Sequence, residues 1–136
     1  MSLHQAAARG LAEWHDLATA PDPARLTELV AEGAVFHSPV VHTPQEGRAL
    51  VVAYLTAAAA TLGKGDFRYL REVLDGDEAV LEFACELGAI HVNGVDMIRF
   101  DEAGRIVDFK VMIRPLKAVN AVWEAMAAQL GQSRSD

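Results

Sequence analysis

The fold is decided by residues 94–106, which read GVDMIRFDEAGRI. The segments on both sides of the centre, 90–100 and 105–114, are rich in β-branched and aromatic residues, which is typical of strands. Between them lies Asp101-Glu102-Ala103-Gly104, where glycine can supply the positive φ of a tight hairpin turn. The stretch therefore predicts two antiparallel strands joined by a short turn.

Two further strands are predicted upstream, over 67–74 and 79–87, with Asp75-Gly76-Asp77 as the turn between them. The next turn is ambiguous, because Asn93-Gly94 is locally the strongest hairpin signal. A turn there would join two strands of very unequal length. We therefore place the turn at Gly88-Ala89 and interpret Asn93-Gly94 as a β-bulge.

Most of the remaining chain has the period of helices, with apolar residues recurring every three or four positions. Asp22 is the expected N-cap of the second helix, with Pro23 at its first position. A short strand, 34–38, and a loop, 40–47, are expected before the third helix, and Gly63-Lys64-Gly65 is expected to end it. The predicted helices span residues 3–17, 23–31, 48–62 and 115–130.

Length and composition exclude several classes of protein. The 136 residues suit one domain, which we place at 1–131, ahead of a polar tail at 132–136. A hydrophobic content of 51% is too high for disorder, and 19 acidic against 12 basic residues argue against binding of nucleic acid. A single cysteine, Cys85, excludes an intramolecular disulfide, and no apolar run approaches the roughly 20 residues that span a bilayer. The first residues lack the pattern of a secretory signal, so we expect a soluble, cytoplasmic protein with no membrane partner.

Helices followed by an antiparallel meander predict an α+β domain. This order, together with residues 94–106, the segment 34–39 and Gly47-Arg48 at the start of a helix, resembles the nuclear-transport-factor-2-like superfamily. The resemblance is to its SnoaL-like and ketosteroid-isomerase-like members and covers about residues 10–115. It implies a cone-shaped α+β barrel, in which N-terminal helices wrap a strongly curved antiparallel sheet and a C-terminal helix follows. It also implies an internal pocket and a homodimer formed through the outer face of the sheet.

The resemblance implies a chemical role for Asp96. In ketosteroid isomerases, an aspartate at this position stays protonated in an apolar pocket and donates a hydrogen bond to the developing oxyanion. The general-base aspartate of those enzymes falls at Ser38, whose hydroxyl is no base at neutral pH. Their oxyanion-hole tyrosine falls near Trp14, which can donate only through its indole N–H. Two of the three catalytic parts are missing, which argues against a ketosteroid isomerase.

Two environments are open for Asp96, which lies between Val95 and Met97 in an otherwise apolar strand. If the side chain points into the pocket, desolvation raises its pKa and permits acid or base chemistry near neutral pH. If it lies at a strand edge, it is solvated or bonded to Arg99 or Arg105. We expect the pocket environment, with Asp96 as the acid or oxyanion donor.

A histidine could replace the missing base, because its pKa lies near neutrality. His37 and His42 flank the segment Ser38-Pro39-Val40-Val41. Alternation along the strand puts Phe36 and Ser38 on one face and His37 on the other. His42, on the loop, is therefore the freer catalytic candidate, and His37 is expected to make a structural hydrogen bond.

Glu82 is the third candidate partner of Asp96. Glu82 and Glu86 share one face of strand 79–87, and apolar residues occupy the other. The simple interpretation sends the glutamates to solvent. The family frame instead places them in the pocket, where nearby carboxyls would push their pKa values apart.

These residues favour a cofactor-free enzyme that binds a hydrophobic small molecule and isomerises, cyclises, dehydrates or hydrolyses it by acid–base catalysis. The alternatives are a non-catalytic homodimeric module that binds a ligand or partner, and a structural domain filled by its own side chains. We expect no metal, since the histidines and acids show no recognised ligand spacing, and no cofactor, since no phosphate loop or CxxC motif is present. The predicted substrate-binding residues are Trp14, Phe36, Ser38, Tyr54, Ile98, Phe100 and Ile113.

Overall fold

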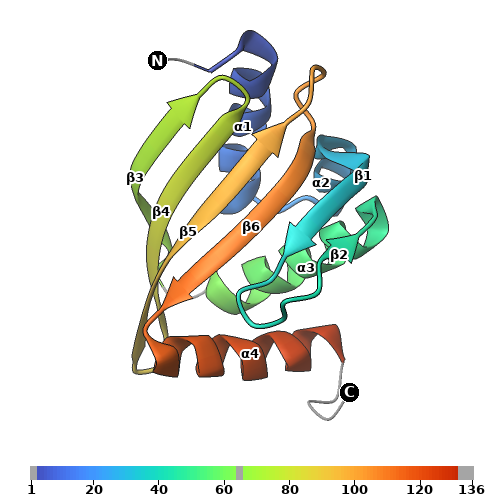
Figure 1. Ribbon diagram of the computed structural model, residues 1–136. Coiled ribbons are helices and arrows are strands. Elements are labelled where there is room, and N and C mark those ends of the chain that lie inside the picture. The colour runs from blue at the N-terminus through green and yellow to red at the C-terminus, as the bar shows by residue number, and fades with distance from the viewer. Residues whose placement is uncertain (1–2, 64–65, 132–136) are drawn as a thin grey trace.

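The computed structural model describes residues 3–63 and 66–131 and shows four helices and six strands (Figure 1). Lys64, Gly65 and the polar tail predicted at 132–136 lie outside the described residues. In the described part of the chain, no helix is long and apolar enough to cross a membrane. The elements are α1 (Gln5–Thr19), α2 (Pro23–Leu29), β1 (Val30–His37), β2 (Gln45–Glu46), α3 (Arg48–Leu62), β3 (Arg68–Asp75), β4 (Glu78–Leu87), β5 (Ile90–Phe100), β6 (Ile106–Arg114) and α4 (Leu116–Leu130).

The strands form one curved, open sheet in the order β2-β1-β6-β5-β4-β3. Helices α1, α2 and α3 lie against one face, α4 crosses the end of the sheet, and the other face is uncovered (Figure 1). The predicted α+β class with a strongly curved sheet is confirmed. One pair differs from the predicted antiparallel meander, because β1 pairs with β6 in parallel. The long connection between them, through α3 and four strands, permits this orientation.

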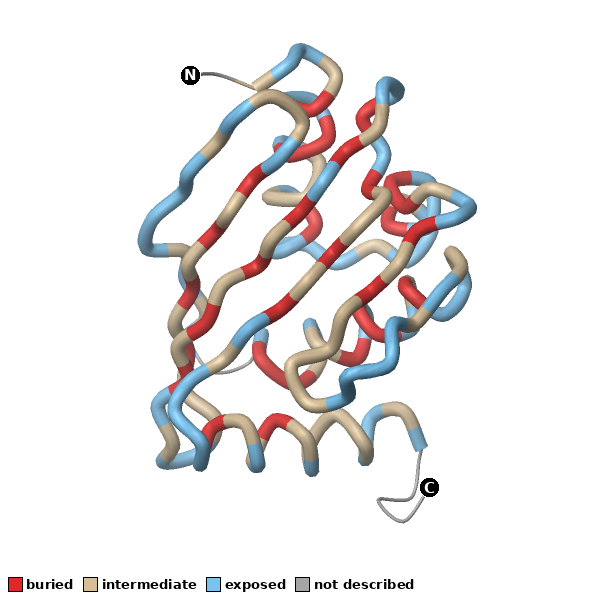
Figure 2. The backbone as a smooth tube through the Cα atoms, viewed as in Figure 1, coloured by how far each residue is buried: buried red, intermediate tan, exposed pale blue. Residues whose placement is uncertain are grey.

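Alternating side chains of β4 and β5 form the core on the covered face of the sheet. The alternation of buried and less buried residues is visible along both strands in Figure 2. On β5 the buried row is Val92, Gly94, Asp96, Ile98 and Phe100. A carboxyl group thus stands in the middle of an apolar row, and the inward environment expected for it is confirmed.

The strand register confirms one predicted turn and corrects one predicted bulge. The β4–β5 turn lies at Gly88-Ala89, as predicted. The bulge predicted at Asn93-Gly94 is wrong, because pairing with both neighbouring strands continues through these residues. A bulge occurs in β3 instead, where Tyr69 pairs with Phe83 and Arg71 with Glu82, so that Leu70 is the extra residue.

The second helix is shorter than predicted. Asp22 is its N-cap, since the carboxylate accepts hydrogen bonds from the amides of Ala24 and Arg25 at 3.1 and 3.3 Å. The helix ends at Leu29 rather than Ala31, and β1 begins at once at Val30. The gain in strand length lets β1 pair with β6 from its first residue.

Helix α1 reaches the sheet through a close contact at Gly10. A Cβ at this position would lie 2.3 Å from the carbonyl oxygen of Gly104 and 2.7 Å from the ring of Phe100. Glycine therefore allows the helix to pack directly on the β5–β6 turn. This packing holds α1 against the sheet and so places Trp14, a residue of this helix, over the covered face.

Candidate functional site

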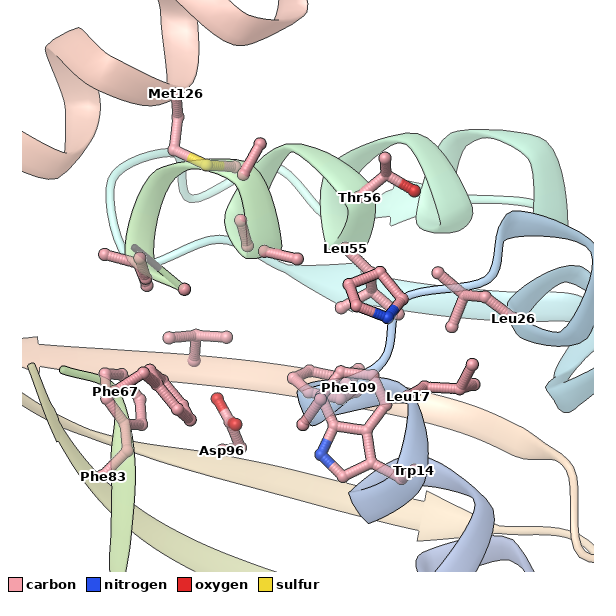
Figure 3. Close-up of a pocket in the computed structure, with 18 of the residues that line it drawn as sticks. Trp14, Leu17, Leu26, Leu55, Thr56, Phe67, Phe83, Asp96, Phe109 and Met126 are labelled. Atoms are coloured by element: carbon pink, nitrogen blue, oxygen red, sulfur yellow. The ribbon is translucent and has the colours of Figure 1, made fainter. Parts of the chain in front are cut away.

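A cavity of about 410 Å³ lies between the curved sheet and the helices that cover it (Figure 3). Asp96 lies on the floor of the cavity, with Phe67 and Phe83 on one side and Phe109 and Trp14 on the other (Figure 3). Helix α3 forms the opposite wall through Leu55 and neighbouring residues. The volume lies in the range of about 300–1,000 Å³ that is typical of small-molecule sites. The wall includes Leu17, Leu26, Phe36, Val111, Ile113, Val122 and Met126.

The Asp96 carboxyl is the buried polar group of this cavity. The residue is 6% exposed, and its Oδ2 accepts a hydrogen bond from the Tyr69 hydroxyl at 2.7 Å. Burial raises the pKa of Asp96 to about 7, and the hydrogen bond from Tyr69 opposes this rise. Both protonation states are therefore populated near neutral pH.

Tyr69 is itself held from the other side by Trp14. The indole N–H of Trp14 donates a hydrogen bond to the Tyr69 hydroxyl oxygen at 2.9 Å. Burial raises the pKa of Tyr69, and the neighbouring Asp96 raises it further, so the phenol keeps its proton. Trp14, Tyr69 and Asp96 form a continuous chain of hydrogen bonds from α1 through β3 to β5.

Tyr69 was not predicted as a site residue, although Phe67 and Tyr69 are two positions apart in the predicted strand and therefore share one face. Regular pairing back from the β3–β4 turn would set Tyr69 opposite Ala84, on the outer face of the sheet. The bulge at Leu70 shifts the register by one residue, so Tyr69 pairs with Phe83 and points inward. Leu70 is left 51% exposed by the same shift.

The described lining carries no positive charge. Its ionisable residues are Asp22, Tyr69 and Asp96, and the Asp22 carboxylate is engaged as the cap of α2. An anionic ligand would therefore meet acidic groups and apolar walls without a counter-ion. The arrangement suits a neutral, apolar molecule with a polar atom directed at Asp96.

Four of the seven predicted substrate-binding residues line the cavity, and three do not. Tyr54 stacks against Phe36 with ring centroids 5.2 Å apart, but it belongs to the core rather than to the lining. Ser38 lines the cavity, and its hydroxyl oxygen accepts a hydrogen bond from the Val40 amide at 3.1 Å. The lining members are Trp14, Phe36, Ser38 and Ile113, and the core members are Tyr54, Ile98 and Phe100.

Neither candidate histidine lines the cavity. His37 points away from it and pairs with Asp108 across β1 and β6, with its Nε2 at 2.8 Å from Oδ1 of Asp108. The structural hydrogen bond expected for His37 is therefore confirmed. His42 is exposed on the loop after β1.

Glu82 lies on the outer face of the sheet. Its carboxylate accepts hydrogen bonds from Nε of Arg71 at 2.6 Å and from Nδ2 of Asn93 at 3.1 Å. The bond from Arg71 lowers the pKa of Glu82 most, the bond from Asn93 lowers it further, and the group stays ionised. The family frame placed Glu82 in the pocket beside Asp96, and that placement is wrong. The simple alternation, with the apolar residues of β4 inward, is correct.

The fold of this chain is shared with proteins of known structure. No match is found among curated protein sequences. The chain is similar to the crystal structure of a steroid delta-isomerase from Pseudomonas aeruginosa, with 41% identity, a TM-score of 0.90, and coverage of 95% of this chain and 94% of that one. A protein with a cystatin-like fold from Silicibacter pomeroyi is 33% identical, with a TM-score of 0.83 and coverage of 92% and 87%.

A de novo designed protein with a curved β-sheet shares the fold alone, at 13% identity, a TM-score of 0.69, and coverage of 91% of this chain and 98% of that one. The family model of the SnoaL-like domain matches residues 11–109, which contain most of the cavity and Asp96. The chain therefore belongs to the SnoaL-like family of the nuclear-transport-factor-2-like superfamily, as its sequence predicted.

Proposed function

We propose that this protein is an enzyme that moves a proton on a neutral, apolar small molecule, with Asp96 as the group that takes and returns it. The observation that supports this most strongly is a carboxyl buried in an apolar cavity, with its pKa raised to about 7 by burial. General acid–base catalysis is most effective when the pKa of the catalytic group lies near the working pH. Asp96 can therefore serve as base in one half of the reaction and as acid in the other.

The reaction class that fits one such carboxyl is isomerisation of an unsaturated ketone. Because the general-base aspartate of ketosteroid isomerases falls at Ser38 here, their mechanism does not apply unchanged, and Asp96 itself would carry the proton. The Asp96 carboxylate takes a proton from the carbon next to the carbonyl, and the C–H electron pair becomes the double bond of an enolate. The protonated Asp96 then returns the proton to another carbon of the conjugated system. The substrate neither gains nor loses atoms, so the step needs no water, cofactor or second base. Dehydration would release a leaving group, and hydrolysis would consume a water. Either reaction would need a second acid–base group beside Asp96, and the described lining offers none.

The ligand class follows from the walls and from similarity. The walls are apolar and carry no cation among the described residues. The similar protein from Pseudomonas aeruginosa is named a steroid delta-isomerase, and a steroid is a neutral, apolar molecule of this kind. The Ser38 hydroxyl lines the cavity, and its hydrogen is available to a ligand carbonyl.

The test is an assay on a β,γ-unsaturated ketosteroid, in which ultraviolet absorbance follows formation of the conjugated enone. The wild-type protein should convert the substrate faster than buffer, and Asp96→Asn should lower kcat/KM by about a hundredfold or more. Glu102→Gln, which removes an exposed carboxyl on the β5–β6 turn, is the matched control and should keep the wild-type rate. Wild-type turnover that survives Asp96→Asn would show that Asp96 is not the proton carrier.

A ligand-binding module without catalysis is the second candidate. It is favoured by the positions of His37, His42 and Glu82, none of which supplies the cavity with a second catalytic group. This candidate predicts that a ketosteroid binds, as measured by calorimetry, and is recovered unchanged after long incubation. Conversion of the bound ketosteroid would exclude it.

We also propose that the outer face of the sheet pairs with a second copy of the chain. Val73 and Met112 are 67% and 52% exposed on this face, and they line one shallow groove together with Arg71 and Glu82. Light scattering should give the mass of a dimer, and Val73→Glu combined with Met112→Glu should give that of a monomer. A monomeric wild-type protein at micromolar concentration would contradict this proposal.

A further inference from the structure

The hydrogen-bond chain beneath the cavity has a defined direction. An indole N–H can only donate, so the oxygen of Tyr69 must accept the bond of 2.9 Å from Trp14. A phenol has one hydrogen, and the other partner of the Tyr69 hydroxyl is Oδ2 of Asp96, at 2.7 Å. The hydrogen of Tyr69 is therefore directed at Asp96.

This direction distinguishes the two oxygens of the Asp96 carboxyl. Oδ2 accepts from Tyr69 whether the carboxyl is ionised or neutral, so the proton of the neutral acid belongs on Oδ1. Within 3–63 and 66–131, no hydrogen-bond partner of Oδ1 is present, and the carboxyl points into the cavity (Figure 3). The oxygen left for a ligand is thus the one that carries the exchangeable proton.

We infer that Trp14 and Tyr69 are positioning residues that confine proton exchange at Asp96 to Oδ1. The inference rests on the proposed function for its role in catalysis, but the geometry exists without a substrate. It also excludes Tyr69 as a donor to the substrate, because its one hydrogen is committed to Asp96. A substrate oxygen therefore cannot accept one hydrogen bond from Tyr69 and a second from Asp96.

The hydrogen-bond chain from Trp14 through Tyr69 also changes the pKa of Asp96. Burial raises the pKa of Asp96, while the hydrogen bond from Tyr69 lowers it. The other ionisable lining residue is Asp22, which caps α2, and the described lining from β4, β6, α3 and α4 is uncharged. Beyond Tyr69, Nε2 of His15 lies 3.1 Å from Oε2 of Glu72, and the His15 ring lies 5.5 Å from that of Tyr69.

Tyr69→Phe removes the donor to Asp96 and keeps the aromatic ring. The titration of the Asp96 side-chain carbon, followed by carbon-13 NMR, should move upward by about one pH unit, a tenfold increase in proton affinity. Trp14→Phe, which releases the oxygen of Tyr69, should move it in the same direction by less. Tyr54→Phe is the matched control, since Tyr54 lies outside the cavity lining, and it should leave the Asp96 midpoint unchanged. An unchanged or lowered midpoint in Tyr69→Phe would overturn the inference.

A second measurement needs no change at Tyr69. The indole N–H signal of Trp14 should shift with the midpoint of Asp96, and this pH dependence should disappear in Asp96→Asn. An indole signal that is indifferent to pH across the Asp96 titration would refute the coupling, even if the phenylalanine variants fail to fold.

Turnover separates the inference from the proposed function. If the enzyme turns over ketosteroid, Tyr69→Phe should shift the pH at which kcat/KM is half-maximal upward together with the Asp96 midpoint. Turnover without any coupling between Trp14 and Asp96 overturns the inference and leaves the proposed function intact. Coupling without turnover upholds the positioning chain and removes the proposed function.

Discussion

Replacing Asp96 by asparagine should change how stability depends on pH. In the unfolded chain an aspartate loses its proton near pH 4, whereas the folded protein holds the Asp96 proton up to about pH 7. Between these values the folded state binds one more proton than the unfolded state, so the free energy of unfolding falls as pH rises. Below about pH 4 the group is neutral in both states, and above about pH 7 the full penalty of a buried charge remains.

The magnitude follows from the two pKa values. The interval from the ordinary value of 3.8 to about 7, at about 1.4 kcal/mol per pH unit, corresponds to about 4 kcal/mol. Asparagine has nearly the same shape, does not titrate, and can still accept the hydrogen bond from Tyr69 through its amide oxygen. Relative to the wild type, Asp96→Asn should therefore gain about 4 kcal/mol of stability between about pH 4 and pH 8.

The assay is urea unfolding of both proteins, followed by circular dichroism at several pH values in this range. The other titrating groups are common to both proteins, so the difference between the two free energies isolates Asp96. Glu102→Gln controls for the loss of one acidic group from the surface. A difference that stays constant within about 1 kcal/mol would refute the burial of an ionisable Asp96.

Two other predictions concern packing and charge. Gly10→Ala should lower the free energy of unfolding by about 1–3 kcal/mol, because its Cβ would lie 2.3 Å from a backbone oxygen of the β5–β6 turn. Gly33→Ala, whose Cβ would meet nothing within 4 Å, should change it by less than about 1 kcal/mol in the same urea titration, and equal losses would contradict the close contact. At about pH 8, a carboxylated analogue of an apolar ligand should bind at least about tenfold more weakly than its neutral parent, since the described lining offers acids but no cation. Calorimetry measures both affinities, and equal affinity would show that a cation reaches the ligand.

The sequence was sufficient to predict the central part of the fold. Strand β5 and the turn at Asp101–Gly104 depend on neighbouring residues, so local pattern was enough to predict them. The inward direction of Asp96 was expected from the family resemblance. The parallel pairing of β1 with β6 joins segments far apart in the chain, and a local pattern carries no information about it. The same limit applies to the short strand β2, which lies within the predicted loop 40–47 and pairs with β1.

The candidate site was predictable where strand alternation decides and not where register or packing decides. Tyr69 faces Asp96 only because the bulge at Leu70 shifts the register of the strand by one residue. No residue type in β3 predicts that bulge. Tyr54 and Leu55 are adjacent on α3, yet only Leu55 lines the cavity. That distinction depends on how neighbouring aromatic rings fill the core, since Tyr54 is stacked on Phe36.

The most direct test of a buried carboxyl with a neutral form at physiological pH is the titration of the Asp96 side-chain carbon in the wild-type protein. The spectrum of Asp96→Asn identifies the signal, because only this carbon loses its pH dependence. Burial in the apolar cavity predicts a midpoint of about 7. A midpoint near 4, the value of an aspartate in water, would contradict both the burial of this carboxyl and the proton transfer assigned to it.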